Sequence, residues 1–159
     1  MSTGDEKMSF LVHTLEYKGS PVIETLSLRN YDSSDYEKYK NIYEDCFFAM
    51  RSALGLPREC CKSSEELASL KDSIFIFEDN GSIIGSVAVY GNEIDDLFVS
   101  SEYQRKGCGL KLLRYAIAYL QKRKTERIIL HAADINQSAL MLYLKNGFVI
   151  TETKVIKTS

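Results

Sequence analysis

Residues 104–109 read Gln-Arg-Lys-Gly-Cys-Gly and join an apolar, strand-like segment to an amphipathic, helix-like segment. Two glycines one residue apart at the start of a helix let the backbone approach a ligand without obstruction by a Cβ atom. The first amide N–H groups of a helix have no intrahelical acceptor and lie at the positive end of its dipole. A strand, this turn and a helix in that order therefore predict an anion-binding cradle.

The charges around this turn are separated along the chain. Residues 104–127 contain eight Lys or Arg and one acid, whereas residues 93–102 contain four acids and no base. A basic helix beside an acidic strand suits a site where an anionic ligand meets a cationic one, and a solvated basic helix face is the alternative. The net charge of −2 argues against a nucleic-acid binder that relies on bulk electrostatics.

The length and composition are those of an ordinary globular protein. A chain of 159 residues fits one domain, which we expect to span residues 1–159. No apolar run approaches the roughly 20 residues that a membrane helix needs, and the polar residues 1–7 lack the apolar core of a signal peptide. The four cysteines have no zinc-site spacing, so we expect reduced thiols, no metal site and a cytoplasmic protein.

The periodicity of apolar residues predicts a mixed α/β sheet. Residues 18–21 (Lys-Gly-Ser-Pro) and the pair Asn80-Gly81 are turn signals, and each is expected to close a hairpin. The order of elements predicts an antiparallel meander followed by a β-α-β-α-β unit. The expected strands cover residues 9–17, 22–31, 74–77, 83–90, 93–99, 127–132 and 148–157, and the expected helices cover residues 36 to between 53 and 57, 64–70, 107–122 and 136–146.

The strand expected at residues 93–99 breaks the rule for its position. A central strand covered by helices on both faces is apolar along its length, yet this one begins with Glu93, Asp95 and Asp96. If the strand is central, these acids lie in a cleft, where desolvation and a polar partner make one of them a candidate base. The alternative is a strand that begins only at Leu97, with the three acids in a solvated loop.

Other glycine-rich motifs are excluded at the turn. A phosphate-binding P-loop needs GxxxxGK[ST] and a dinucleotide site needs GxGxxG, and neither occurs. What occurs is [Q/R]-x-x-G-x-[G/A] between a strand and a helix, followed by N-x-x-A-x-x-L-Y-x-K-x-G-F at residues 136–148. This ordered pair of motifs resembles the GNAT superfamily of acyl-CoA N-acyltransferases, and the resemblance covers residues 28–155.

The resemblance implies the fold of that family and its co-substrate. We expect a mixed, mostly antiparallel central sheet flanked by helices, and acetyl-CoA as the acyl donor. In the family, amides of the turn hold the CoA pyrophosphate, the end of the preceding strand pairs with the pantetheine arm, and a downstream asparagine also contacts the cofactor. The matching residues here are Leu97, Phe98, Val99, Gln104, Arg105, Lys106, Gly107, Cys108, Gly109, Leu110 and Asn136.

The resemblance also implies catalytic roles. A tyrosine at the position of Tyr143 often protonates the departing CoA thiolate, and some members use a carboxylate at the position of Glu93 as the base. An amine with a pKa of ~10 arrives as an ammonium ion and must lose a proton before it attacks the thioester. Glu93 and Asp95 are therefore the candidate bases, and the Val99 N–H is the candidate donor to the oxyanion.

Several of these residues have structural alternatives. Tyr143 is otherwise a core tyrosine, and Asn136 is otherwise only an N-cap. His131 is expected to be structural, and Cys108 is expected to be a turn residue because direct attack by an amine needs no acyl-enzyme. The tyrosines of the first helix are expected to pack in the core: Tyr36, Tyr39 and Tyr43.

The chain departs from the family pattern at both ends. Only eleven residues follow Phe148, enough for one strand, whereas the family usually adds a further hairpin partner. The extra N-terminal strand at residues 9–17, or a second subunit in a homodimer, is expected to cover that edge of the sheet. Acceptor specificity in the family depends on these variable ends.

The sequence thus predicts a cytoplasmic, acetyl-CoA-dependent N-acetyltransferase that transfers the acetyl group directly to a primary amine of a small molecule or protein. The acidic strand favours a cationic acceptor. A non-catalytic acyl-CoA-binding or interaction module of the same fold is one alternative, and an unrelated nucleotide-binding protein is another.

Overall fold

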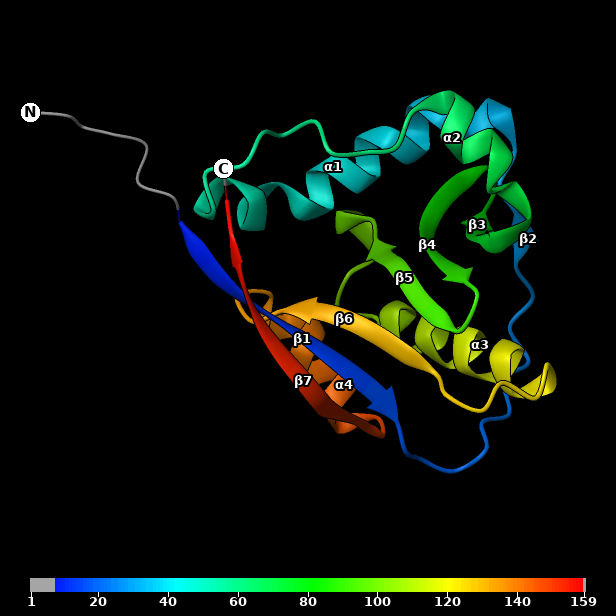
Figure 1. Ribbon diagram of the computed structural model, residues 1–159. Helices are drawn as coiled ribbons and strands as arrows, with labels where there is room; N and C mark the ends of the chain where they lie inside the picture. Colours follow the sequence, from blue (N-terminus) through cyan, green and yellow to red (C-terminus); the bar gives the residue numbers. More distant parts are fainter. Residues whose placement is uncertain (1–7, 159) are drawn as a thin grey trace, which may run out of the picture.

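A computed structural model describes residues 8–158, and its central element is one seven-stranded sheet (Figure 1). Residues 1–7, whose polar composition argues against a signal peptide, lie outside the described range. The strands are β1 (Ser9–Tyr17), β2 (Arg29–Asn30), β3 (Ile74–Asp79), β4 (Ser82–Tyr90), β5 (Glu93–Val99), β6 (Ile129–Ala133) and β7 (Phe148–Lys157). The α-helices are α1 (Tyr36–Ala53), α2 (Ser64–Ser69), α3 (Cys108–Lys122) and α4 (Gln137–Lys145).

The strand order across the sheet is β2-β3-β4-β5-β6-β1-β7. Neighbouring strands are antiparallel except for β5 and β6, which run parallel. The crossover between these two parallel strands contains α3, as a β-α-β unit requires. The expected fold class, a mixed and mostly antiparallel sheet flanked by helices, is therefore confirmed.

Helices cover both faces of this sheet. One core combines α3 and α4 with the strands beneath them and includes Leu113 and Ile117. The other core lies under α1 and α2 and includes Tyr39 and Leu67. In residues 8–158, no helix is both long enough and apolar enough to cross a membrane.

The hairpin predicted at Asn80-Gly81 is confirmed. Strand β3 pairs with β4, and the last pair before the turn is Asp79 with Ser82. Both turn residues have positive φ, 50° for Asn80 and 79° for Gly81, which is the backbone geometry of the two-residue turns that match strand twist.

The first predicted hairpin, by contrast, is wrong. Residues 22–28 form no strand, and β2 is a two-residue strand that pairs with β3. Side chains of α3 form hydrogen bonds with backbone groups of this segment, in place of a neighbouring strand. Gln121 accepts from the Val22 N–H at 2.8 Å, and Arg114 donates to the Ile23 carbonyl at 3.0 Å. Backbone groups satisfied in this way need no strand partner.

Strand β1 lies inside the sheet and does not cover its edge. It pairs with β6 from Val12↔Ala133 to Glu16↔Ile129 and with β7 along its whole length. The partner of the last strand is thus the first strand, and β7 itself forms the edge (Figure 1).

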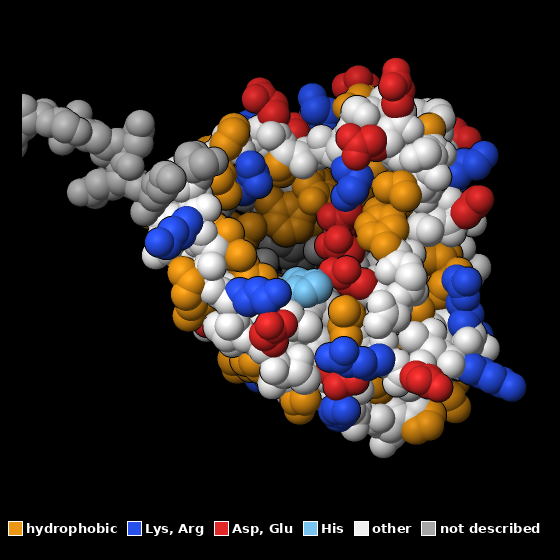
Figure 2. Space-filling view, viewed as in Figure 1, with side chains coloured by type: hydrophobic (Ala, Val, Ile, Leu, Met, Phe, Trp, Pro, Cys, Tyr) orange, Lys and Arg blue, Asp and Glu red, His pale blue; other side chains and the backbone are white. Residues whose placement is uncertain are grey.

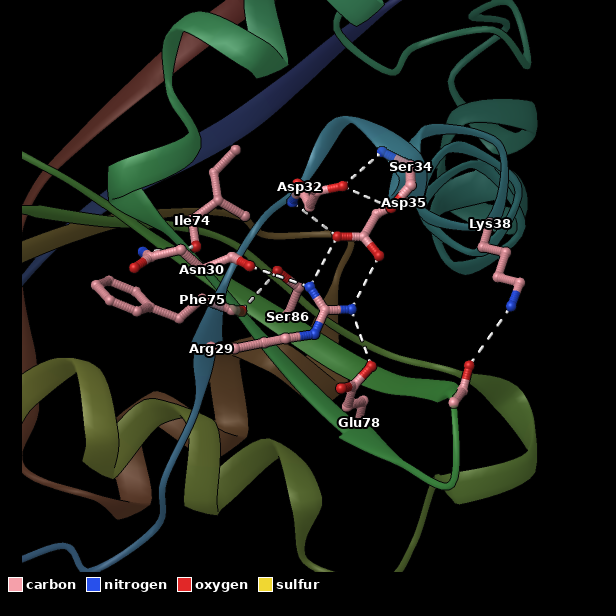
Figure 3. Close-up of polar contacts among 11 residues, drawn as sticks. Arg29, Asn30, Asp32, Ser34, Asp35, Lys38, Ile74, Phe75, Glu78 and Ser86 are labelled. Atoms are coloured by element: carbon pink, nitrogen blue, oxygen red, sulfur yellow. Dashed lines mark hydrogen bonds and ion pairs between the residues drawn. The ribbon is translucent and has the colours of Figure 1, made fainter.

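An ion-pair network fixes β2 and the entry to α1 (Figure 3). The two guanidinium nitrogens of Arg29 donate to the two carboxylate oxygens of Asp35 at 2.8 and 2.9 Å, and one also donates to Glu78 on β3 at 2.9 Å. Asp35 is buried, and although desolvation opposes the charged form, the bonds from Arg29 and the Asp32 N–H leave its pKa below the usual range. Bidentate pairing of this kind positions α1 against the sheet.

Candidate active site

A cleft opens where β5 and β6 separate. These parallel strands pair only at Glu93↔Ile129 and Ile94↔Leu130, and beyond that point they diverge (Figure 1). Two adjoining cavities, of about 230 and 190 Å³, occupy the gap and share Phe47, Leu97, Asn136 and Tyr143 in their walls. Figure 2 shows a hollow with apolar side chains around its floor and with acidic side chains and a histidine at its edge.

A bulge in β5 shapes this cleft. Between the pairs Ser86↔Phe98 and Ala88↔Asp95, β5 has one residue more than β4, and Asp96 has a φ of +48°. The extra residue reverses the alternation of side chains, so Ile94 lies in the α3 core while Phe98 lies in the α1 core. The strand begins at Glu93, so the alternative in which the acids belong to a loop before Leu97 is wrong.

Asp96 is a buried structural carboxylate. It accepts hydrogen bonds from the hydroxyl of Tyr43 at 2.9 Å, from Nζ of Lys62 at 2.9 Å and from the hydroxyl of Tyr90 at 3.4 Å. Burial and the charge of Asp96 raise the pKa of both tyrosines. A carboxylate with three donors is satisfied, so its contacts hold the bulge in place.

The cleft brings Asp95 together with Tyr143. Both residues line the larger cavity, one from β5 and the other from α4. Desolvation, and then the charge of Asp96, raise the pKa of Asp95 above its ordinary value. Burial, and then the charge of Asp95, raise the pKa of Tyr143 to about 12. The raised pKa keeps the Tyr143 hydroxyl protonated at neutral pH, so a proton is present there for donation.

Glu93 lies apart from this pair. Its Oε1 is 2.6 Å from Nδ1 of His131 on β6, and Glu93 is not among the residues that line the larger cavity, whereas His131 is. The sequence assigned Glu93 a possible role as base and gave His131 a structural one, and the structure joins the two residues in one unit.

The end of β5 presents backbone groups to the cleft. The Ser100 N–H donates to the Ile84 carbonyl, so Val99, the next residue back, has its N–H and carbonyl directed away from β4. The Val99 carbonyl accepts from the Gln104 side chain at 2.9 Å and from the Cys46 thiol. Leu97, Phe98, Val99 and Gln104 all line the smaller cavity.

The predicted cradle is present as geometry. Gly107 is the N-cap of α3 with φ 79°, and Arg105 also has positive φ, at 63°. Within residues 8–158, no acceptor binds the amide N–H groups of residues 105–110, and the first intrahelical bond runs from the Lys111 N–H to the Gly107 carbonyl. Arg105, Lys106 and Gly107 are exposed, while Cys108, Gly109 and Leu110 are half-buried. Six consecutive free donors suit an anion.

Asn136 occupies the N-cap position of α4 but does not cap it with its side chain. Within residues 8–158, its side chain makes one hydrogen bond, in which Oδ1 accepts from the Ser138 hydroxyl at 3.5 Å, and the residue lines both cavities. The amide is therefore available to a ligand.

Two residues of the site were missed by sequence reasoning. Lys62 ties the loop before α2 to Asp96, and the buried Glu44 of α1 accepts from the amides of Cys60 and Cys61 at 3.0 and 3.2 Å. Glu44 lies outside the apolar stripe of α1, so the periodicity of the helix did not mark it. No pattern marked Lys62, since its partner is set by the tertiary fold.

Comparison with known proteins agrees with this architecture. Residues 36–148 match the model of the Acetyltransferase (GNAT) family. An uncharacterized N-acetyltransferase of Methanocaldococcus jannaschii is 24% identical over 149 residues, which are 86% of this chain and 65% of that protein. Streptothricin acetyltransferase A of Bacillus subtilis is 31% identical over 81 residues, which are 48% of this chain and 47% of that protein.

A solved structure shares the fold. The crystal structure of a GNAT-family protein from Novosphingobium aromaticivorans superposes with a TM-score of 0.70 at 17% identity, covering 93% of this chain and 63% of that one. In each of these three comparisons the chain spans less than two-thirds of the relative's own length. Because the family model covers most of the sequence and both of its motifs, the chain belongs to the GNAT family of acetyltransferases.

Proposed function

We propose that this protein is an acetyl-CoA-dependent N-acetyltransferase that transfers the acetyl group directly to a primary amine. The observation that carries the proposal is the pair of adjoining cavities, whose walls run from Gln104 and Gly109 at the start of α3 to Asp95 and Tyr143. An anionic, elongated donor and a cationic acceptor fit the two ends of such a cleft.

The cradle fits the pyrophosphate of CoA. The amides of residues 105–110 would hold the phosphates, with charge from Arg105 and Lys106, and Leu97, Phe98, Val99, Gln104 and Asn136 would line the path of the pantetheine arm. Bound acetyl-CoA supplies the activated acetyl thioester. Binding energy gained at the pyrophosphate, far from the reacting carbon, would hold the thioester in position for attack.

The acceptor amine enters at the acidic end. Asp95 lines the larger cavity, where its carboxylate attracts an ammonium ion. Of the two carboxylates predicted from the sequence, only Asp95 lines the cleft, and Glu93 meets it through His131.

Two donors would assist the transfer. The Val99 N–H, directed away from β4, is placed to receive negative charge that develops on the acyl oxygen. Tyr143 gives its proton to the departing thiolate, a role supported by its place in the wall of both cavities and by its hydroxyl, which has no hydrogen-bond partner within residues 8–158 and is not among the fully buried ones.

The test is to offer the protein acetyl-CoA with a panel of small amines, amino sugars and lysine peptides. Transfer is detected by the release of free CoA thiol and by mass spectrometry of the acetylated product. Binding of CoA with no transfer to any amine would identify a non-catalytic module. Tighter thermal stabilisation by ATP or NAD than by CoA would identify a nucleotide-binding protein. The double variant D95N/Y143F, which leaves the cradle intact, is the control for catalysis without loss of CoA binding.

A further inference from the structure

The Glu93 and His131 pair is the second set of titratable side chains at the cleft. Nδ1 of His131 lies 2.6 Å from Oε1 of Glu93, across the point where β5 and β6 are still paired. The His131 side chain is 44% exposed and lines the larger cavity beside Asp95. Figure 2 shows a histidine side by side with acidic side chains at the edge of the hollow.

The short contact fixes the tautomer of the imidazole. A carboxylate can only accept, so the hydrogen lies on Nδ1, and in the neutral ring Nε2 is left as a bare acceptor. No side chain or backbone group of residues 8–158 binds Nε2. A carboxylate that orients an imidazole and favours its protonated form is the arrangement of a general base.

Several charged or titratable groups surround this imidazole. On its inner side the cavity wall contains Asp95 and Asp96 of β5, Tyr43 and Arg51 of α1, Cys60 of the loop before α2, and Tyr143 of α4. On its outer side a shallow hollow over β1, β6 and β7 contains Arg127, Glu152 and Lys154. Within residues 8–158, the side chain that hydrogen-bonds the imidazole is that of Glu93.

We infer that His131, oriented by Glu93, is the base that takes the proton from the acceptor amine, while Asp95 holds the ammonium ion in place. The Nε2 lone pair accepts one N–H proton, and the freed nitrogen lone pair attacks the acyl carbon. The C–S bond then breaks, and Tyr143 protonates the departing thiolate. The second N–H proton of the adduct restores the Tyr143 hydroxyl, and the imidazolium returns its proton to solvent at its exposed edge. Imidazole suits this step near neutral pH better than a carboxylate does. The inference rests on the proposed N-acetyltransferase function.

The test is the pH profile of kcat/KM with the best amine, for the wild type and for H131Q and E93Q. Changing His131 to Gln should lower kcat/KM by about 100-fold or more near pH 7, and the defect should shrink as the pH approaches the pKa of the amine. Changing Glu93 to Gln keeps an acceptor for Nδ1 but removes the charge. Because the imidazole keeps its orientation in E93Q, kcat/KM of this variant should fall less than that of H131Q.

A second readout does not depend on turnover. The chain has two histidines, so the imidazole NMR signals that disappear in H131Q belong to His131, and those that remain belong to the buried His13. The titration midpoint measured for His131 should coincide with the acid limb of kcat/KM, in the wild type and in E93Q alike. Circular dichroism confirms that each variant is folded.

The outcomes separate the two claims. An active enzyme whose H131Q variant keeps the same acid limb, or loses activity equally at every pH, overturns the role of His131 and leaves the proposed function standing. A wild-type protein that acetylates no amine overturns the proposed function, and with it this inference.

Discussion

Nζ of Lys62 lies 2.9 Å from Oδ2 of Asp96, and this contact joins the loop before α2 to the bulge in β5. Asp96 is 7% exposed in this pair and Lys62 is 32% exposed, so the ion pair is partly shielded from solvent. Burial lowers the pKa of Lys62, but the hydrogen bond and charge of Asp96 outweigh it and leave the pKa raised. The wall of the cleft thus depends on one lysine.

Changing Lys62 to Met should destabilise the protein by about 1–3 kcal/mol, because Asp96 would keep its charge with only two tyrosine donors. Urea denaturation measures the loss. The control is K154M, since the pair of Lys154 with Glu152 is 3.8 Å long and exposed on both sides, and it should not move the urea midpoint. Equal effects of both variants would contradict a structural role for Lys62.

The same lysine predicts a pH dependence with a definite sign. A base whose pKa is raised in the folded state contributes stability that is fully present below its unfolded pKa of about 10.4. That contribution disappears as the pH rises through the folded value. The stability gap between wild type and K62M should therefore be constant at neutral pH and close above about pH 10.4. If the difference in stability instead widens above that pH, the Lys62–Asp96 ion pair is not the cause of the destabilisation in K62M.

Tyr143 should affect turnover more than binding or stability. Replacement by Phe should lower kcat by about 100-fold while the KM for acetyl-CoA changes little, since only the proton donor is removed. The pKa of about 12, set by burial and then by Asp95, keeps the hydroxyl protonated. Ionisation of Tyr143 should therefore cause no fall in wild-type kcat at any pH up to about 10. Steady-state kinetics measure both, and an unchanged kcat in Y143F would remove Tyr143 from the mechanism.

Two glycines with the same backbone angle separate folding from ligand binding. Gly107 in the cradle and Gly81 in the β3–β4 turn both have φ +79°, and a Cβ at either would meet no atom within 4 Å. Changing either to Ala should cost a similar amount, about 1–2 kcal/mol of backbone strain. Only G107A should weaken CoA binding, by about tenfold or more, in calorimetric titrations. Parallel loss in both variants would refute the cradle.

Gly109 tests close approach without strain. A Cβ there would lie 3.7 Å from Leu142 and 3.9 Å from Val99, which are ordinary contacts, so G109A should fold as stably as the wild type. The added methyl group would stand at the wall of the smaller cavity and should weaken CoA binding. Unchanged affinity would mean that the ligand does not approach this helix turn.

Glu44 should control access to two thiols. Burial raises the pKa of Cys60 and Cys61, so both should react slowly with iodoacetamide at neutral pH. Changing Glu44 to Ala leaves two amides without their acceptor and should loosen this loop, at a cost of about 2–3 kcal/mol.

The matched control is E44Q, which keeps an acceptor oxygen for the two amides. Its thiols should react at a rate closer to that of the wild type than to that of E44A. Equal alkylation rates in E44A and wild type would show that Glu44 does not order the loop.

The parts of the fold that were predictable rest on local signals. The Asn80-Gly81 turn needs positive φ at both residues, and the predicted hairpin formed there. The glycine turn before α3 and the caps of α4 at Asn136 and Asn146 also matched their expected places. Such features depend on a few adjacent residues, so sequence suffices for them.

The misses have long-range causes. Residues 22–28 look like a strand, but Gln121 and Arg114 of α3 satisfy polar backbone groups of the segment. The bulge at Asp96 was not predicted, although an aspartate tolerates positive φ better than most residues do. The pairing of His131 with Glu93 follows from the register of β5 against β6, which no single segment specifies.

The place of β1 between β6 and β7 has a consequence for how the protein is made. Strand β1 precedes the other six strands of this sheet but pairs with β6 and β7, which are the last two of the seven, so it must wait until they have been made. Contacts of such large sequence separation form slowly and carry the entropy of closing a long loop. We therefore expect β1 to be made before the rest of the sheet and to be among the last strands placed. A nascent chain held before residue 148 would expose one side of it as an unpaired edge.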